Sequence, residues 1–392
     1  MPDIEKRIIG WLEDRKEMIF FILISCIGVV MRICGRDFIS GDADVCLLPW
    51  YDEIKENGGL HALGNQVGNY GIPYQCLIAL MTYLPFQALY LYKAFSCIFD
   101  FALAYISAKF IALVKPDDLS GGGLKVYGLV LLCPVVVANS SLWAQCDAIY
   151  VFFLLESLYY LYKGNQIRAF LIFGVSVAFK LQAVFIVPFF IFYYVKDKKC
   201  SIFSMAGMSL IGFSVMQIPG WIMHRSFLEP LQVYQEQADT YKSMWMNFPS
   251  FWVLLGNDYE HLKSVAVLLT IGILGVGLLA FMESSVCIGD AGNFMQALIW
   301  SVWTCLLFLP AMHERYSYLL MILLILHACL DLRIFCYAVL ELLCSTVSYG
   351  NFLYGNQINL KMLSFVYALS YFSYTCQILK ENATLQRFDR SR

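Results

Sequence analysis

The chain has 392 residues, of which 60% are hydrophobic and 14% are charged, whereas soluble domains carry roughly 25% charged residues. Its formal net charge is -2 at pH 7 and no long run of like charge occurs, so nothing indicates a nucleic-acid partner. Apolar runs of about 17 to 25 residues recur along the sequence, which excludes an ordinary soluble enzyme and predicts a polytopic membrane protein.

The apolar runs predict helices, because backbone in lipid must satisfy its own hydrogen bonds and the alternation expected of a barrel is missing. We therefore expect one all-α integral-membrane domain over residues 1–392. Its twelve predicted transmembrane helices are residues 17–35, 88–114, 124–140, 147–162, 167–180, 183–195, 200–222, 264–282, 293–310, 316–331, 333–349 and 360–378. Segment 73–84 is apolar but too short to cross, so we expect a re-entrant or interfacial helix there.

Basic residues set the predicted orientation. Basic residues flank the first apolar run and no convincing cleavage site follows, which favours an uncleaved signal anchor with a cytoplasmic N-terminus. The C-terminus is then cytoplasmic as well, and the positive-inside rule is satisfied. The basic residues used are Lys6, Arg7, Arg15, Lys16, Lys115, Lys125, Lys163, Arg168, Lys196, Lys198, Lys199, Arg333, Lys380, Arg387, Arg390 and Arg392. This threading places residues 36–87, a long first external loop, and residues 139–147, 223–263 and 309–316 outside.

Asp42 and Asp44 stand directly after the first predicted helix, in Gly41-Asp42-Ala43-Asp44. A carboxylate held at the membrane surface can accept a proton from a hydroxyl, which is the work of a general base. Either acid could instead only cap the helix that residues 45–56 predict. The aromatic residues that follow favour a functional role.

The segment Trp143-Ala144-Gln145-Cys146-Asp147 lies between two apolar runs and returns to the same face as Asp42. Asp147 could simply favour the start of its helix electrostatically. Together, Trp143, Gln145 and Asp147 are more typical of a sugar-binding cluster, with a ring for stacking and polar groups for hydroxyls.

Lys180 lies in Phe179-Lys180-Leu181-Gln182, inside an apolar region. A buried ammonium is costly and by default indicates function with an anionic partner, although snorkelling to the interface is the alternative. In Met312-His313-Glu314-Arg315-Tyr316, Arg315 can clamp a phosphate and His313 or Glu314 can orient it. A plain salt bridge of Arg315 near Glu314 is the other possibility.

Five stretches, in order over residues 40–316, resemble a known family: Gly-Asp-x-x-x-x-Leu-x-Pro-Trp-Tyr, Asn-Tyr-x-x-Pro-Tyr, Trp-x-Gln-x-Asp, Phe-Lys-Leu-Gln and Met-His-Glu-Arg-Tyr. Together they resemble the bacterial mannosyltransferase-like branch of the GT-C glycosyltransferases, named for its likeness to the second mannosyltransferase of glycosylphosphatidylinositol-anchor synthesis. The resemblance implies a GT-C-type bundle that transfers a sugar, with inversion, from a polyprenyl-phosphate donor to an extracytoplasmic acceptor. In the second motif the family's usual Gly is Ala144 here.

The resemblance also implies roles for individual residues. Asp42 would be the catalytic base, with Asp44 as second candidate. Lys180, Arg315 and His313 would face the donor phosphate. The candidates for sugar or acceptor binding are Trp143, Gln145, Asp147, Trp50, Tyr51, Asn69, Tyr70 and Glu314. We expect no metal, although the Asp42/Asp44 pair leaves room for magnesium or manganese.

The expected partners are the lipid bilayer of a bacterial plasma membrane, a polyprenyl-phosphate sugar, and a glycolipid, polysaccharide or protein acceptor of the cell envelope. A lipid or sugar transporter is the main rival, but no convincing internal repeat supports it. A noncatalytic membrane subunit is the second alternative.

Overall fold

The computed structural model describes residues 3–116, 122–198 and 200–390. Lys199 and Arg392, which entered the topology prediction, lie outside the described residues, and the side chains of Lys6, Arg387 and Arg390 are not described either.

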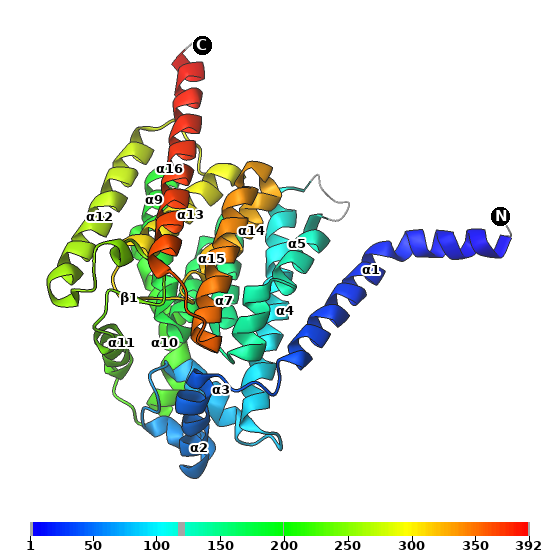
Figure 1. The fold of residues 1–392 in the computed structure, drawn as a ribbon, viewed down its shortest axis with the longest axis vertical. Helices are drawn as coiled ribbons and strands as arrows, with labels where there is room; N and C mark the ends of the chain where they lie inside the picture. The colour runs from blue at the N-terminus through cyan, green and yellow to red at the C-terminus, as the bar shows by residue number, and fades with distance from the viewer. Residues whose placement is uncertain (1–2, 117–121, 199, 391–392) are drawn as a thin grey trace.

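The described chain is almost entirely helical (Figure 1). Its α-helices are α1 (Asp3–Cys34), α2 (Leu48–Glu56), α3 (Ile72–Met81), α4 (Ala88–Val114), α5 (Gly122–Leu131), α6 (Pro134–Val137), α7 (Asp147–Tyr162), α8 (Gln166–Phe179), α9 (Val187–Asp197), α10 (Ile202–Ile222), α11 (Glu229–Thr240), α12 (Tyr259–Glu283), α13 (Ala291–Phe308), α14 (Tyr318–Leu330), α15 (Phe335–Tyr354) and α16 (Leu360–Arg390). Short π or 3-10 segments are η1 (Ala43–Leu47), η2 (Gly59–Gly64), η3 (Ala138–Leu142), η4 (Leu181–Ile186), η5 (Phe251–Leu254) and η6 (Leu332–Ile334). Two strands, β1 (Trp245–Met246) and β2 (Met312–His313), pair in parallel.

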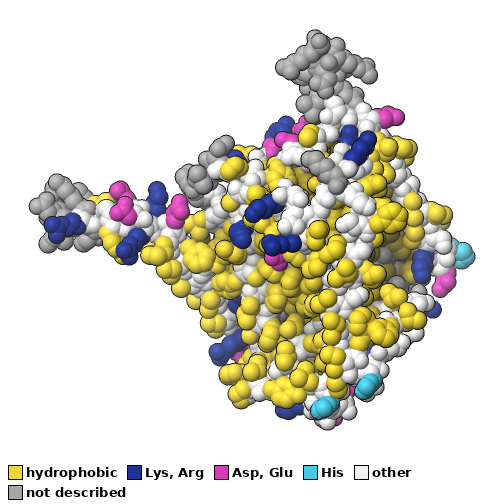
Figure 2. All heavy atoms as spheres, turned by 180° about the vertical axis from the view of Figure 1, so that it is seen from behind, with side chains coloured by type: hydrophobic (Ala, Val, Ile, Leu, Met, Phe, Trp, Pro, Cys, Tyr) yellow, Lys and Arg dark blue, Asp and Glu magenta, His cyan; other side chains and the backbone are white. Residues whose placement is uncertain are grey.

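Each of the twelve predicted segments contains a helix, which confirms an all-α chain of membrane-protein character. Within the described residues, six helices are long and apolar enough to cross a membrane, and α5 with the segment Pro134–Leu142, bent by 48°, would make a seventh. Twelve crossings therefore stay a prediction. Hydrophobic side chains cover much of the face drawn in Figure 2, as a lipid-facing surface requires.

Segment 73–84 was expected to be a short helix, and α3 confirms the helix with 10 residues. Its interfacial or re-entrant placement stays a prediction. In Figure 1, α2 and α3 lie together at one end of the molecule, while α1 leans away from the bundle toward its N-terminus.

Buried charges on α4 anchor the end of α1 and the start of the first external loop. Asp100 accepts a hydrogen bond from Arg32 Nε at 2.8 Å, and both side chains are buried. The Lys93 ammonium donates to the carbonyl oxygens of Gly35 at 2.8 Å and Arg36 at 3.0 Å. Because a buried charge is costly without partners, these contacts fix where the chain leaves α1. They set the starting position of the Asp42 segment.

The 223–263 segment was predicted only as an external loop, yet it contains α11 and β1. Strand β1 pairs Trp245 with Met312 and Met246 with His313, so this segment holds the Met-His-Glu-Arg-Tyr stretch by backbone hydrogen bonds. The buried Arg225 side chain also donates to Gln66 Oε1 and Gln75 Oε1, each at 2.7 Å. The segment thus connects the first external loop with the 309–316 loop.

Candidate functional site

The segment before η1 is fixed by Ser40. Its hydroxyl donates to the carbonyl oxygen of Trp143 at 3.0 Å and accepts from the backbone N–H of Ala43 at 3.2 Å. These two bonds join the first external loop to the Trp-x-Gln-x-Asp segment, 103 residues later. The π-helical turn that follows directs Asp42 inward, whereas Asp44 stays exposed.

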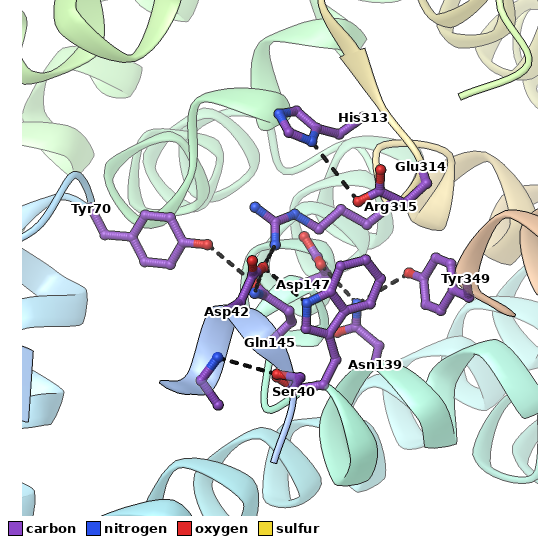
Figure 3. Close-up of polar contacts among 12 residues, drawn as sticks. Ser40, Asp42, Tyr70, Asn139, Gln145, Asp147, His313, Glu314, Arg315 and Tyr349 are labelled. Carbon is purple, nitrogen blue, oxygen red and sulfur yellow. Dashed lines mark hydrogen bonds and ion pairs between the residues drawn. The ribbon is translucent and has the colours of Figure 1, made fainter. Parts of the chain in front are cut away.

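Asp42 is the point where three segments of the chain meet (Figure 3). Its Oδ2 atom accepts hydrogen bonds from Arg315 Nη1 at 2.9 Å, Trp143 Nε1 at 2.9 Å and Gln145 Nε2 at 2.8 Å. A cationic donor and two neutral donors thus converge on one carboxylate oxygen and fix its orientation. The Asp42 side chain is 29% exposed, so the carboxylate is fixed and still accessible.

The Trp143 ring does not offer a face for a sugar. It is 0% exposed, stacks on Phe352 with ring centres 4.5 Å apart, and meets the edge of Tyr349. The Arg315 guanidinium lies 5.6 Å from the ring centre. The expectation of sugar stacking on Trp143 is therefore wrong for this structure, because neighbours enclose the ring. Its indole N–H instead positions Asp42.

The backbone at Ala144 explains how Trp143 and Gln145 both reach Asp42. Ala144 has a φ of 62°, in the left-handed region that favours glycine. The turn is closed by a hydrogen bond from the Gln145 N–H to the Asn139 carbonyl at 2.9 Å. Ala144 therefore holds a backbone conformation that costs an L-residue with a side chain more than it costs glycine.

Asp147 and Lys180 form a buried ion pair beneath Asp42. Their side chains are 1% and 4% exposed, and the Lys180 ammonium contacts Asp147 Oδ1. Asp147 Oδ2 accepts from Asn139 Nδ2 at 2.8 Å, and the same amide group donates to Tyr349 Oη at 3.1 Å. The anionic partner expected for Lys180 is thus Asp147, and snorkelling is excluded because the ammonium is buried.

In the 309–316 loop, Arg315 contacts Asp42, whereas His313 and Glu314 lie close to each other. The Glu314 N–H donates to the Met246 carbonyl at 3.1 Å, and Ala311 adopts a φ of 57°. His313 Nδ1 lies 3.9 Å from Glu314 Oε1, and Figure 3 draws this pair beside Arg315 with no contact marked from either side chain to Asp42. Arg315 therefore forms a salt bridge, which was the alternative to phosphate binding, but its partner is Asp42 and not a group near Glu314.

The first external loop adds Tyr70. Its hydroxyl donates to Gln145 Oε1 at 3.0 Å, so the amide that holds Asp42 is itself held. Burial raises the pKa of Tyr70 well above its usual range, which keeps the hydroxyl protonated and able to donate. The Lys180 ammonium lies 5.5 Å from the ring centre of Tyr70. Tyr70 thus joins the Asp42 cluster to the Lys180 pair.

Other predicted site residues of the first loop lie around this cluster. The ring of Trp50 packs edge-on against Tyr70 with centres 5.5 Å apart. Tyr51 is buried at 5% exposure and belongs to the hydrophobic core, so direct sugar binding by its ring is not supported. The Asn69 carbonyl accepts a hydrogen bond from the Gln237 side chain, which ties it to α11.

Several polar atoms of the predicted motifs are buried without a hydrogen-bond partner among the described residues. They are Arg315 Nε, His313 Nε2, Glu314 Oε2, Asn69 Oδ1 and Gln182 Oε1. Thirteen further buried side-chain atoms without a hydrogen-bond partner lie elsewhere among the described residues, so these five do not by themselves single out the motifs, although bound water or a ligand can satisfy such groups. All five lie in or beside the stretches that carry the resemblance.

Sequence reasoning missed the contribution of the C-terminal helices. The motifs end at residue 316, yet α15 supplies Tyr349 to Asn139 and Phe352 to Trp143. Among the described residues, no group of three or more His, Cys, Asp or Glu side chains is arranged to hold a metal ion. Asp42 and Asp44 are not placed to bind one metal ion together, because Asp42 contacts Arg315 and Asp44 is exposed.

No protein-family model and no curated protein sequence matches this chain. The assignment of a function therefore depends on the geometry of the site and on the resemblance of its motifs.

Proposed function

We propose that the protein is an inverting membrane glycosyltransferase that moves a hexosyl group, with mannosyl as first choice, from a polyprenyl-phosphate carrier to an extracytoplasmic hydroxyl. The observation that carries the proposal is the hydrogen bond that Arg315, in the last of the five motifs, donates to Asp42, in the first. A base and a phosphate-binding cation are the two groups that this reaction needs.

The proton transfer falls to Asp42. The acceptor oxygen forms a bond to the anomeric carbon, on the face opposite the phosphate, while the bond from that carbon to the phosphate oxygen breaks. The hydroxyl proton moves to Asp42, and the bonding electron pair leaves with the phosphate. The three donors on Oδ2 hold the carboxylate in a single orientation for this step.

The proton transfer to Asp42 also changes the charge balance at Arg315. In the resting site its charge is balanced by Asp42 at 2.9 Å. Once Asp42 is protonated, that balance is lost just as negative charge develops on the leaving phosphate. The guanidinium then interacts more strongly with the phosphate in the transition state than in the ground state, which is the condition for acceleration.

Lys180 has a supporting role in this proposal. Its ammonium is buried and paired with Asp147, so it acts as a fixed charge beneath the site. Fixed charges in a site with little water stabilise developing charge without reorganising. Lys180 and Asp147 also position Asn139, which reaches Tyr349. The formal charges of Asp42, Arg315, Asp147 and Lys180 sum to zero before the donor binds.

The test is sugar transfer by purified protein in nanodiscs. Radiolabelled mannosyl, glucosyl and galactosyl polyprenyl phosphates are supplied in turn, with a bacterial membrane extract as acceptor. We expect label in a new product with one donor and an inverted anomeric configuration. Absence of transfer with all three donors, in protein that is folded, would contradict the proposal and favour a transporter or a noncatalytic subunit.

A further inference from the structure

A narrow polar cavity lies inside the bundle, between α15, α16, the end of the 309–316 loop and the segment after β1. Its lining includes two carboxylates, Glu314 and Glu341, and every lining residue is buried. The space between the lining atoms totals about 140 Å³ and is too narrow to admit a water molecule. Two acidic side chains thus face a small enclosed space instead of solvent.

The polar side of the cavity comes from one face of α15. Glu341, Ser345 and Ser348 follow each other at steps of four and three residues, so they lie on the same side of the helix. Their exposed fractions are 3% or less. The helix belongs to the segment Leu332–Tyr354, which is long and apolar enough to cross a membrane, and Glu341 stands near its middle. An ionisable residue in such a place is costly and by default indicates a function.

Only one oxygen of the Glu341 carboxylate is satisfied. Its Oε1 atom accepts a hydrogen bond from the Ser345 hydroxyl at 3.0 Å, and Ser345 and Ser317 share a hydrogen bond of 2.9 Å. Its Oε2 atom is buried without a hydrogen-bond partner, and no Lys, Arg or His pairs with this carboxylate among the described residues. Because an uncompensated buried charge is costly, Glu341 requires either a proton or a cation.

Three further oxygen atoms of the lining also have no hydrogen-bond partner among the described residues. They are Glu314 Oε2, Ser348 Oγ and Tyr367 Oη, on side chains that are 2% exposed or less. Atoms of this kind occur elsewhere in the described chain, but here four of them, from the 309–316 loop, α15 and α16, line one cavity. A proton on Glu341 can join only two of these oxygens, whereas a cation can bind all four.

We propose that this cavity is a sodium-ion site. Glu341 Oε2 and Glu314 Oε2 are its charged ligands, and the hydroxyl oxygens of Ser348 and Tyr367 are its neutral ligands. Four oxygen ligands with no nitrogen or sulfur suit a hard cation. The proposal is independent of the proposed glycosyltransferase function, because neither Asp42 nor Arg315 lines the cavity.

Charge and size select sodium among the hard cations. Calcium takes roughly six to eight oxygen ligands, and the described residues hold no group of three or more acidic, His or Cys side chains around one metal position. His313 Nδ1 already lies 3.9 Å from Glu314 Oε1, so one monovalent cation is enough to compensate Glu341. A dehydrated sodium ion is smaller than a water molecule, whereas a potassium ion is about as large as one, so the narrow space favours sodium.

The experiment measures binding of radioactive Na⁺ to the purified full-length protein in detergent, at mildly alkaline pH and with choline chloride to keep the ionic strength constant. We expect saturable binding that NaCl displaces and an equal concentration of KCl does not. Glu341→Gln keeps the side-chain shape and removes the charge. It should bind Na⁺ more than about 10-fold more weakly, since loss of even an outer-shell partner of a metal ligand commonly costs that much. Ser348→Ala, with both carboxylates intact, should also weaken binding.

The matched control is Glu156→Gln, which removes a half-buried carboxylate of α7 outside the cavity and should bind Na⁺ as the wild type does. Thermal unfolding in NaCl and in KCl provides a second readout. The midpoint of the wild type should be higher in NaCl, and that difference should vanish in Glu341→Gln. No saturable Na⁺ binding by folded wild type would mean that Glu341 carries a proton instead and would overturn the site. Wild-type affinity in Glu341→Gln, or equal loss in Glu156→Gln, would overturn it as well.

Discussion

Arg315 donates a hydrogen bond to Asp42 at 2.9 Å although 273 residues separate them in the chain. The contact is possible because α4 anchors the first external loop through Lys93, and β1 holds the 309–316 loop. Both sides of the pair are thus positioned by other elements before any substrate binds. In the proposed glycosyltransferase, Asp42 and Arg315 would thus act as base and phosphate-binding cation from positions that are already set.

Replacing Arg315 with Lys should keep the positive charge and lose the planar, forked donor geometry. We expect kcat for sugar transfer to fall by about 10²- to 10³-fold, the range for loss of one transition-state donor, with a smaller change in KM. Steady-state kinetics with the polyprenyl-phosphate donor measures both. A rise in KM with unchanged kcat would instead mean that Arg315 binds the ground state and the transition state equally strongly.

Trp143→Phe should separate the indole hydrogen bond from ring packing. The variant keeps an aromatic ring against Phe352 but removes the N–H donor to Asp42, for a cost of about 1.5 to 3 kcal/mol. We expect a large loss of transfer and a small fall in the thermal unfolding midpoint. Trp143→Ala serves as the contrast, because an empty ring cavity should cost about 3 to 5 kcal/mol. Full transfer by Trp143→Phe would show that the indole does not position Asp42.

Lys180→Met and Asp147→Asn should each strongly destabilise the protein. Each variant leaves one charge of a buried pair uncompensated, at a cost of about 3 to 5 kcal/mol. The double variant removes both charges, so its loss of stability should be smaller than the sum of the two single losses. Thermal unfolding of the four proteins in one detergent gives the coupling energy. Additive losses would mean that the two charges do not stabilise each other.

Sugar transfer should continue in the presence of a chelator. Asp42 Oδ2 already accepts three hydrogen bonds, one from a cation, and the exposed Asp44 is directed elsewhere. We therefore expect transfer in excess EDTA to equal transfer in buffer with added magnesium or manganese. Loss of activity in EDTA that either metal restores would contradict this prediction and return the Asp42/Asp44 pair to consideration as a metal site.

The helices could be predicted well from the sequence, because apolar runs in lipid have few alternatives to helix. The exceptions are segments whose structure depends on distant partners. The helix α11 has a largely polar sequence, and Tyr234 within it donates to the Val177 carbonyl at 2.7 Å. Strand β1 has two residues and exists only because β2 pairs with it. Neither contact leaves a local pattern in the sequence.

The candidate site was predicted in part. Sequence alone predicted that Asp42 meets polar groups from elsewhere in the chain, and Gln145 and Arg315 are among them. It did not predict the orientation of Trp143, because Phe352 and Tyr349, which enclose the ring, come from a helix more than 200 residues later. Charge and motif order can be read from the chain, whereas side-chain burial depends on the packed bundle.

The most direct test compares Asp42→Asn with Asp44→Asn in the transfer assay, at equal amounts of folded protein. The two acids are two residues apart, but only Asp42 accepts from Arg315, Trp143 and Gln145. We predict that Asp42→Asn loses transfer by about 10²- to 10⁴-fold, the usual contribution of a general base, while Asp44→Asn keeps most of it. Wild-type rates in Asp42→Asn would contradict the assignment of Asp42 as the base.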